Sequence, residues 1–130
     1  MTKSIKNKPS KPTVSQNEDL IPVTIKKHGD KNGGHNHVIL ETFENKHVSV
    51  GLTTNATKGK NSTNKNYKCE RSPLGDGKQS YMRRQGTVAP TKEYAKKEIK
   101  GKMTPKDYEK AKGYGAKAKQ KYLKKTNKKQ

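Results

Sequence analysis

The sequence predicts a mainly β protein with a C-terminal α-helix, in which four to six short strands form a small barrel or strongly curved sheet. Most apolar β-branched residues fall in two runs, 35–40 and 47–54, joined by a short polar turn. Turn-forming residues then separate several further short apolar segments. The phrase Thr104-Pro105-Lys106-Asp107 marks the start of the closing helix.

The chain has little material for a core. Only 25% of its 130 residues are apolar, with no tryptophan and one phenylalanine. We therefore expect a folded centre over 20–123, between a disordered basic arm at 1–19 and a basic tail at 124–130.

Five segments are expected as strands, in chain order 20–25, 37–43, 47–52, 67–70 and 80–88. Pro22 limits the first to a sheet edge or to the strand start, because proline donates no ladder hydrogen bond. The turn 44–46 joins the second strand to the third. The polar tract 54–66 is expected as a mobile loop.

The closing helix has a specific start signal. Thr104 supplies an N-cap hydroxyl, Pro105 suits the first helical position, and Asp107 places an acid in the first turn. Small residues and tyrosines then recur at helical spacing, at Tyr108, Ala111, Gly115, Ala118 and Tyr122. Such a narrow face predicts close packing of the helix against the sheet.

The charge points to a polyanionic partner. Thirty-one Lys and Arg against eleven Asp and Glu give a net charge of +20. Only Arg71, Arg83 and Arg84 are arginines, so lysine supplies the attraction and these three supply fixed geometry. The alternative is that the charge serves solubility alone.

The chain is expected in the cytoplasm without a membrane partner. No apolar run is long enough to span a bilayer, and the N-terminus lacks the hydrophobic segment of a secretory signal. The single cysteine, Cys69, cannot form an internal disulfide and is expected as a small buried apolar residue.

Histidines are placed where metal-free RNA cleavage could use them. That reaction needs groups to move protons and fixed positive charge on the phosphorane. His35, His37 and His47 are candidates for the first task, and strand alternation puts His35 and His37 on one side. Arg83 and Arg84 could supply the charge. Each histidine can equally be a strand-end residue without a role, and no further ligand at fixed spacing completes a metal site, so no cofactor is expected.

Four segments resemble, in order, the pattern of PemK/MazF-like toxin endoribonucleases: Gly33-Gly34-His35-Asn36-His37-Val38-Ile39-Leu40, Val48-Ser49-Val50-Gly51-Leu52-Thr53-Thr54, Gln85-Gly86-Thr87-Val88 and Gly101-Lys102-Met103-Thr104-Pro105-Lys106-Asp107-Tyr108. The resemblance implies an SH3-like barrel with a C-terminal helix that cuts single-stranded RNA without a metal. It also implies that the Thr53 hydroxyl contacts the scissile phosphate, with Thr54 as the small residue beside it.

The chain departs from that pattern at the charged positions. Asn36 stands where the family usually has an arginine, and 85–88 lacks the arginine of its phrase, although Arg83 and Arg84 lie just upstream. Either the chemistry has moved to histidines and these arginines, or the fold binds RNA without cutting it.

Two classes of function remain. The first is an endoribonuclease of the toxin–antitoxin or mobile-element type, with a site of His35, His37, Thr53, Thr54, Arg83 and Arg84. The second is a non-catalytic module that binds backbone phosphates. RNA contacts are expected from Lys58, Lys60, Lys65, His47 and Tyr81. RNA is the expected partner. A toxin would also have an antitoxin, either an acidic protein or an RNA, and a homodimer is compatible with the sequence.

Overall fold

The computed structural model describes residues 20–29, 35–57 and 65–128, with side chains up to residue 125. These residues form, in order, β1 (Ile21–His28), β2 (His35–Phe43), β3 (Lys46–Thr53), β4 (Tyr67–Lys68), β5 (Tyr81–Met82), β6 (Thr87–Pro90), the 3-10 helix η1 (Thr91–Glu93), β7 (Ile99–Met103) and α2 (Pro105–Lys128). The predicted class, mainly β with a C-terminal helix, is confirmed. The predicted arm 1–19 lies outside the described residues.

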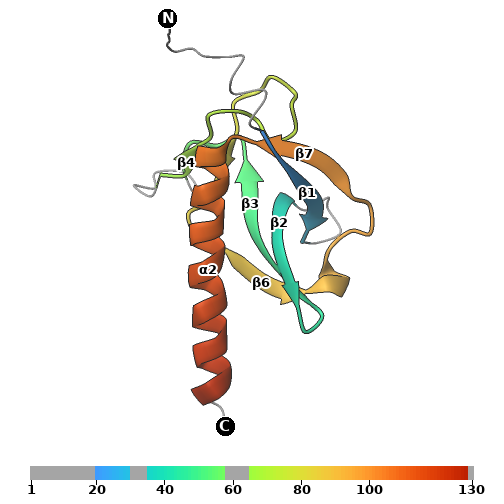
Figure 1. Ribbon diagram of the computed structural model, residues 1–130, viewed down its shortest axis with the longest axis vertical. Helices are drawn as coiled ribbons and strands as arrows, with labels where there is room; N and C mark the ends of the chain where they lie inside the picture. The colour runs from blue at the N-terminus through green and yellow to red at the C-terminus, as the bar shows by residue number, and fades with distance from the viewer. Residues whose placement is uncertain (1–19, 30–34, 58–64, 129–130) are drawn as a thin grey trace, which may run out of the picture.

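The strands form one antiparallel sheet of seven strands in the order β4-β5-β3-β2-β1-β7, with β6 paired to β3. No pairing joins β4 to β7 within the described part of the chain, so the sheet is open where a barrel would be closed. It has seven strands where four to six were expected. Figure 1 shows α2 standing beside these strands, with its last turns reaching beyond them.

The β2–β3 hairpin is the centre of the sheet. Phe43 pairs with Lys46 across a two-residue turn in which Glu44 and Asn45 have φ of 48° and 65°. Two positive φ angles match the twist that a tight hairpin needs. The predicted turn is therefore confirmed at Glu44 and Asn45, whereas Lys46, also predicted in the turn, is the first residue of β3.

The first strand uses its proline as expected. Pro22 is opposite Lys102 of β7, whereas the pairing of β1 with β2 starts at Thr24. Pro22 therefore lies beyond the stretch where β1 has neighbours on both sides, and its missing N–H interrupts no central ladder.

Two expectations about the strands were wrong in detail. The segment predicted as one strand over 80–88 is divided into β5 and β6, and β7 was not predicted. In β7, Gly101 packs so closely that a Cβ would lie 2.6 Å from both Ile25 Cδ1 and the carbonyl oxygen of Pro73. The glycine permits this approach. In β7, buried Gly101 and Met103 alternate with exposed lysines, but a glycine at a buried position is not recognised as apolar in the sequence.

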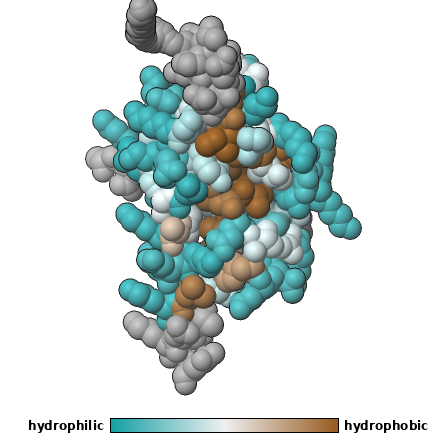
Figure 2. Space-filling model, in the orientation of Figure 1, coloured by the Kyte–Doolittle hydropathy of each residue, from teal (hydrophilic) through white to brown (hydrophobic). Residues whose placement is uncertain are grey.

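The core lies between the sheet and α2. Its fully buried members come from several strands and the helix, namely Ile25, Val38, Val50, Met82, Met103 and Ala111. Figure 2 shows apolar residues gathered over the strands beside α2, with hydrophilic residues surrounding them. Cys69 is buried as expected, and burial raises the pKa of its thiol to about 12, which keeps it protonated.

The small-residue face of α2 permits the close packing that was predicted. A Cβ on Gly115 would lie 2.5 Å from Leu40 Cδ1 and 3.1 Å from Val48 Cγ1. At the start of β6, a Cβ on Gly86 would lie 2.8 Å from the carbonyl oxygen of Tyr114. Glycine on both sides of this contact lets β6 approach the middle of the helix.

The helix is longer than expected. It continues to Lys128, through most of the segment 124–130 predicted as a tail, because lysine, glutamine and leucine are good helix formers. Its second half is anchored to the β2–β3 hairpin. Tyr122 packs edge-on against Phe43 at 6.0 Å between ring centroids, and Lys119 forms an ion pair with Glu41.

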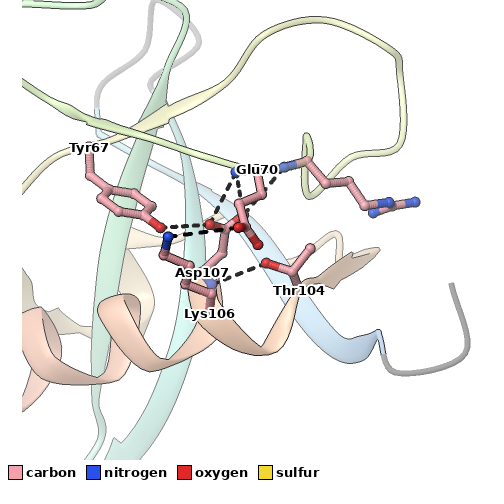
Figure 3. Close-up of polar contacts among 6 residues, drawn as sticks. Tyr67, Glu70, Thr104, Lys106 and Asp107 are labelled. Atoms are coloured by element: carbon pink, nitrogen blue, oxygen red, sulfur yellow. Dashed lines mark hydrogen bonds and ion pairs between the residues drawn. The ribbon is translucent and has the colours of Figure 1, made fainter. Parts of the chain in front are cut away.

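A buried carboxylate fixes the start of α2. Thr104 Oγ1 accepts a hydrogen bond from the Asp107 amide at 3.1 Å, as the N-cap pattern predicted. The Asp107 side chain, 0% exposed, accepts hydrogen bonds from the Tyr67 hydroxyl and the Glu70 amide, both at 2.9 Å (Figure 3). The Arg71 amide adds a longer one at 3.4 Å. Asp107 therefore ties the segment after β4 to the helix.

Among the helices that the structure describes, none combines the length and apolar character needed to cross a bilayer.

Candidate nucleic-acid interface

An open groove of about 1350 Å³ runs between α2 and the chain that joins β5 to β6. Gly86 and Ala118 bring its two walls together at one side. Among the residues that the structure describes, seven cationic side chains and no carboxylate line it. The seven are Lys65, Arg83, Arg84, Lys117, Lys121, Lys124 and Lys125. We call this feature the basic groove.

The basic groove is suited to a flexible polyanion. Arg84 and the lysines at 117, 121 and 124 are exposed, so their charges reach solvent. The two walls come from residues about thirty positions apart in the chain, and only the packing of β6 on α2 brings them together. Positive charge on two facing walls attracts a phosphate backbone over its length.

Three predicted residues line this groove. Arg83, Arg84 and Lys65 are all in its walls. Lys58 and Lys60, predicted as RNA contacts, lie outside the described residues.

A second group of predicted residues lies near the start of β2 and the end of β3. His37 pairs with Gly51, and the amide of Arg83 donates to the Gly51 carbonyl at 3.0 Å. His37, Gly51 and Arg83 thus form one row across three neighbouring segments of the sheet. We call this row the Gly51 site.

The side chains of His37 and Arg83 both lie near the position that a Gly51 Cβ would occupy. A Cβ on Gly51 would lie 3.2 Å from His37 Nε2 and 3.5 Å from Arg83 Cδ. The imidazole and the arginine side chain therefore flank the same position, on the face opposite the core residues Val38 and Val50. The predicted association of His37 with Arg83 is present in the structure.

Two consecutive hydrogen bonds fix the His37 ring through its Nδ1 atom. Its Nδ1 lies 2.9 Å from Ser49 Oγ, and Ser49 Oγ lies 2.8 Å from the Tyr94 hydroxyl. His37 is 8% exposed. Burial first, and then the neighbouring His28, His35 and Arg83, lower the pKa of His37 to about 4. The ring is therefore neutral near pH 7.

This low pKa predicts acid sensitivity. A histidine whose pKa falls from 6.5 unfolded to about 4 folded binds fewer protons when folded, so it stabilises the protein above pH 6.5. That contribution is lost as the pH falls from 6.5 to about 4, by up to about 3 kcal/mol. Denaturant unfolding at pH 7 and pH 4 should show a smaller acid loss for His37→Gln than for the wild type. Equal losses would contradict this role of His37.

The remaining predicted catalytic residues line a smaller pocket of about 280 Å³. His35, Thr53 and Thr54 all line it, together with Lys27 and Lys78. His35 and Thr54 are exposed, whereas Thr53 is buried and its Oγ1 accepts a hydrogen bond from the Asn55 amide at 3.1 Å. The structure thus brings His35 and Thr53 together, as predicted, while Arg84 lies apart in the basic groove.

The basic groove and this pocket adjoin each other. Asn66 lines the groove and Asn55 lines the pocket. The Asn66 side-chain amide donates to the Asn55 carbonyl at 3.0 Å. One hydrogen bond therefore joins the wall of one to the wall of the other.

Two predicted RNA contacts are not supported by their positions. His47 is 8% exposed near the opposite end of β3 from Thr53; its Nδ1 contacts Thr42 Oγ1 at 2.7 Å and its ring packs edge-on against Tyr94. Burial lowers the pKa of His47, so its ring is an uncharged interior group. Tyr81 is half-buried in β5 and lines neither the basic groove nor the pocket.

Several residues of the site were not anticipated. The lysines of α2 were not among the predicted RNA contacts, and nothing local in the sequence says that four of them face 83–88. The pattern His47-Ser49-Gly51-Thr53 does alternate, which is a signal for a second, polar face of β3. Tyr94 comes from a loop, so its place against Ser49 depends on the tertiary fold.

The described residues contain no cluster of three or more His, Cys, Asp or Glu side chains that could hold a metal ion. Comparison of the chain with protein-family models, with curated proteins and with solved structures finds no match.

Proposed function

We propose that this protein binds nucleic acid, with RNA as the expected partner, through backbone phosphates held along the basic groove. The observation that carries this proposal is the lining of the groove, in which the described part of the chain places seven cations and no carboxylate. In a groove whose charge is supplied mainly by lysines, contacts go to phosphates and carry little base information.

The proposal is tested by the salt dependence of binding. Affinity of the purified protein for a short single-stranded RNA should fall steeply between about 50 and 200 mM salt, because bound phosphates release counterions. Four to seven contacts predict a slope of log K against log salt of roughly −3 to −5. A slope near zero, or no binding at low salt, would contradict the proposal.

A second candidate function is metal-independent cleavage of the bound RNA, as the PemK/MazF-like resemblance suggests. The observation in its favour is that His35, Thr53 and Thr54 share a pocket that adjoins the basic groove. A strand held in the groove would reach this pocket. The exposed imidazole of His35 is then the group to move protons, and the Thr53 hydroxyl the group to contact the phosphate.

His37 is less suited to the task of a base. An efficient base near neutral pH has a pKa close to that pH, and His37 has a pKa of about 4. Under this candidate His37 and Arg83 would therefore act on the phosphate charge. His35 would take the proton of the attacking 2′-hydroxyl and, as its imidazolium, return that proton to the leaving oxygen. A toxin of this kind would be inhibited by an acidic partner that covers the basic groove.

Cleavage is separated from binding by incubating RNA with the protein in the presence of a chelator. Cleavage predicts discrete fragments from the wild type, and their loss in His35→Ala and Thr53→Ala with RNA binding retained. If the protein binds the RNA tightly and the RNA stays intact, the second candidate is rejected and the non-catalytic binding function remains.

A further inference from the structure

The protons of the Tyr94–Ser49–His37 chain can be assigned from its partners. Burial raises the pKa of Tyr94, so its hydroxyl keeps its proton. Among the described residues the only hydrogen-bond partner of that hydroxyl is Ser49 Oγ, at 2.8 Å. A buried donor needs an acceptor, so Tyr94 donates to Ser49.

The direction of the second bond follows from the first. Ser49 has one proton, and with its oxygen accepting from Tyr94 it donates to His37 Nδ1 at 2.9 Å. A neutral imidazole carries one N–H, so that proton is on Nε2. The opposite direction would leave the Tyr94 hydroxyl without an acceptor.

This tautomer directs a donor to the position above Gly51. His37 Nε2 is the atom that lies 3.2 Å from where a Gly51 Cβ would be. Arg83 flanks the same position with its Cδ at 3.5 Å. No acceptor for Nε2 or for the Arg83 guanidinium is found in the described part of the chain.

We propose that the Gly51 site binds a single phosphate group, which accepts hydrogen bonds from His37 Nε2–H and from the Arg83 guanidinium. An imidazole N–H and an always-charged guanidinium, carried by neighbouring segments, match the oxygens of a phosphate better than any uncharged ligand. Because Gly51 has no Cβ, nothing from this position crowds His37 Nε2 or the Arg83 side chain.

The inference rests on the proposed function only in taking phosphate as the anion, and it adds a defined point of contact. Arg83 lies in both the basic groove and the Gly51 site. One phosphate of a bound strand would therefore be fixed here, while lysines of the groove hold its neighbours loosely.

The test uses inorganic phosphate and the intact protein, at constant ionic strength set with sodium chloride. Histidine ¹⁵N signals are recorded by NMR during the titration, and His37→Gln identifies which of the four histidines is observed. We expect the Nε2–H tautomer of His37 in the free protein and a saturable shift of its signals with phosphate. The signals of His47 should not move.

Variants decide where the phosphate binds. Arg83→Gln should weaken phosphate binding about tenfold or more, since a charge-assisted hydrogen bond is lost. Gly51→Ala should do the same because its Cβ crowds both donors. The matched control is Gly113→Ala, since a Cβ there meets no atom within 4 Å and Gly113 lies outside the groove lining.

Three results would overturn the inference: no shift of His37 with phosphate, an Nδ1–H tautomer, or equal phosphate affinity in wild type and Arg83→Gln. The Arg83→Gln result stands even if Gly51→Ala does not fold. Any of these outcomes, with salt-dependent RNA binding intact, would reject the Gly51 site and leave the basic groove in place.

Discussion

Replacing Asp107 with alanine is expected to lower the free energy of unfolding by about 3–5 kcal/mol, a loss comparable to the whole stability of many small domains. The carboxylate is 0% exposed and accepts hydrogen bonds from the Tyr67 hydroxyl and the Glu70 amide. Alanine would remove the acceptor of these two partly buried hydrogen bonds, and a donor left unsatisfied costs about 1–3 kcal/mol. Urea unfolding followed by circular dichroism measures the change.

The matched control for this prediction is Glu109→Ala in the same first turns of α2. Glu109 forms an exposed ion pair with Lys112 at 3.1 Å, so its loss should change stability by no more than about 0.5 kcal/mol. Asp107→Asn should fall between the two variants, because an amide keeps one acceptor oxygen. If Asp107→Ala were as stable as Glu109→Ala, the carboxylate would not be what holds α2 to the segment after β4.

Neutralising the basic groove is expected to weaken RNA binding at least about a hundredfold near 0.1 M salt. The variant changes Arg84, Lys117, Lys121 and Lys124 to glutamine, all four exposed and in the groove lining. Removing four phosphate contacts should also make the salt dependence shallower, by about 3 in the slope of log K against log salt. Fluorescence anisotropy with a labelled single-stranded RNA measures both effects.

The control removes the same net charge elsewhere. Lys92, Lys96, Lys97 and Lys100 are exposed and lie outside the groove lining, so their change to glutamine should weaken binding only a few-fold through the long-range field. If the two quadruple variants lost affinity equally, net charge alone would explain the binding. The basic groove would then have no special role.

Local signals in the sequence predicted the parts of the fold that local chemistry determines. The tight turn at Glu44 and Asn45 joins two apolar β-branched runs, and Thr104 with Pro105 starts the helix at the expected residue. Pro22 lies near the start of its strand, where its missing N–H is tolerated. In each case the residue that signals the structure lies within a few positions of the backbone conformation that it favours.

What the sequence could not show depends on contacts between distant segments. Asp107 was expected as a first-turn acid, but its bonds to the Tyr67 hydroxyl and the Glu70 amide join positions about forty residues apart. His47 was expected as an RNA contact, yet Tyr94, from the loop after β6, packs against its ring. The open sheet likewise depends on which distant strands pair, since no pairing joins β4 to β7 in the described part of the chain and no local pattern indicates this.

In the candidate site, too, some features were predicted from the sequence and others depend on contacts between distant segments. His37 and Arg83 were assigned to one site because RNA cleavage needs proton transfer and positive charge, and the structure has them together at Gly51. Three cations of the basic groove, Lys65, Arg83 and Arg84, were predicted site residues. Its lysines on α2 were not named as RNA contacts, because they face solvent in any isolated helix. Only the packing of Gly86 against the helix backbone brings 83–88 opposite them.

Lysine acetylation footprinting tests the central claim, binding along the basic groove, most directly. Wild-type protein is treated with a limiting acetylating reagent, with and without single-stranded RNA, and each lysine is quantified by mass spectrometry. RNA should protect Lys117, Lys121 and Lys124 while Lys92, Lys96 and Lys97 react as before. Protection of the second set alone, or equal protection of both sets, would contradict the account.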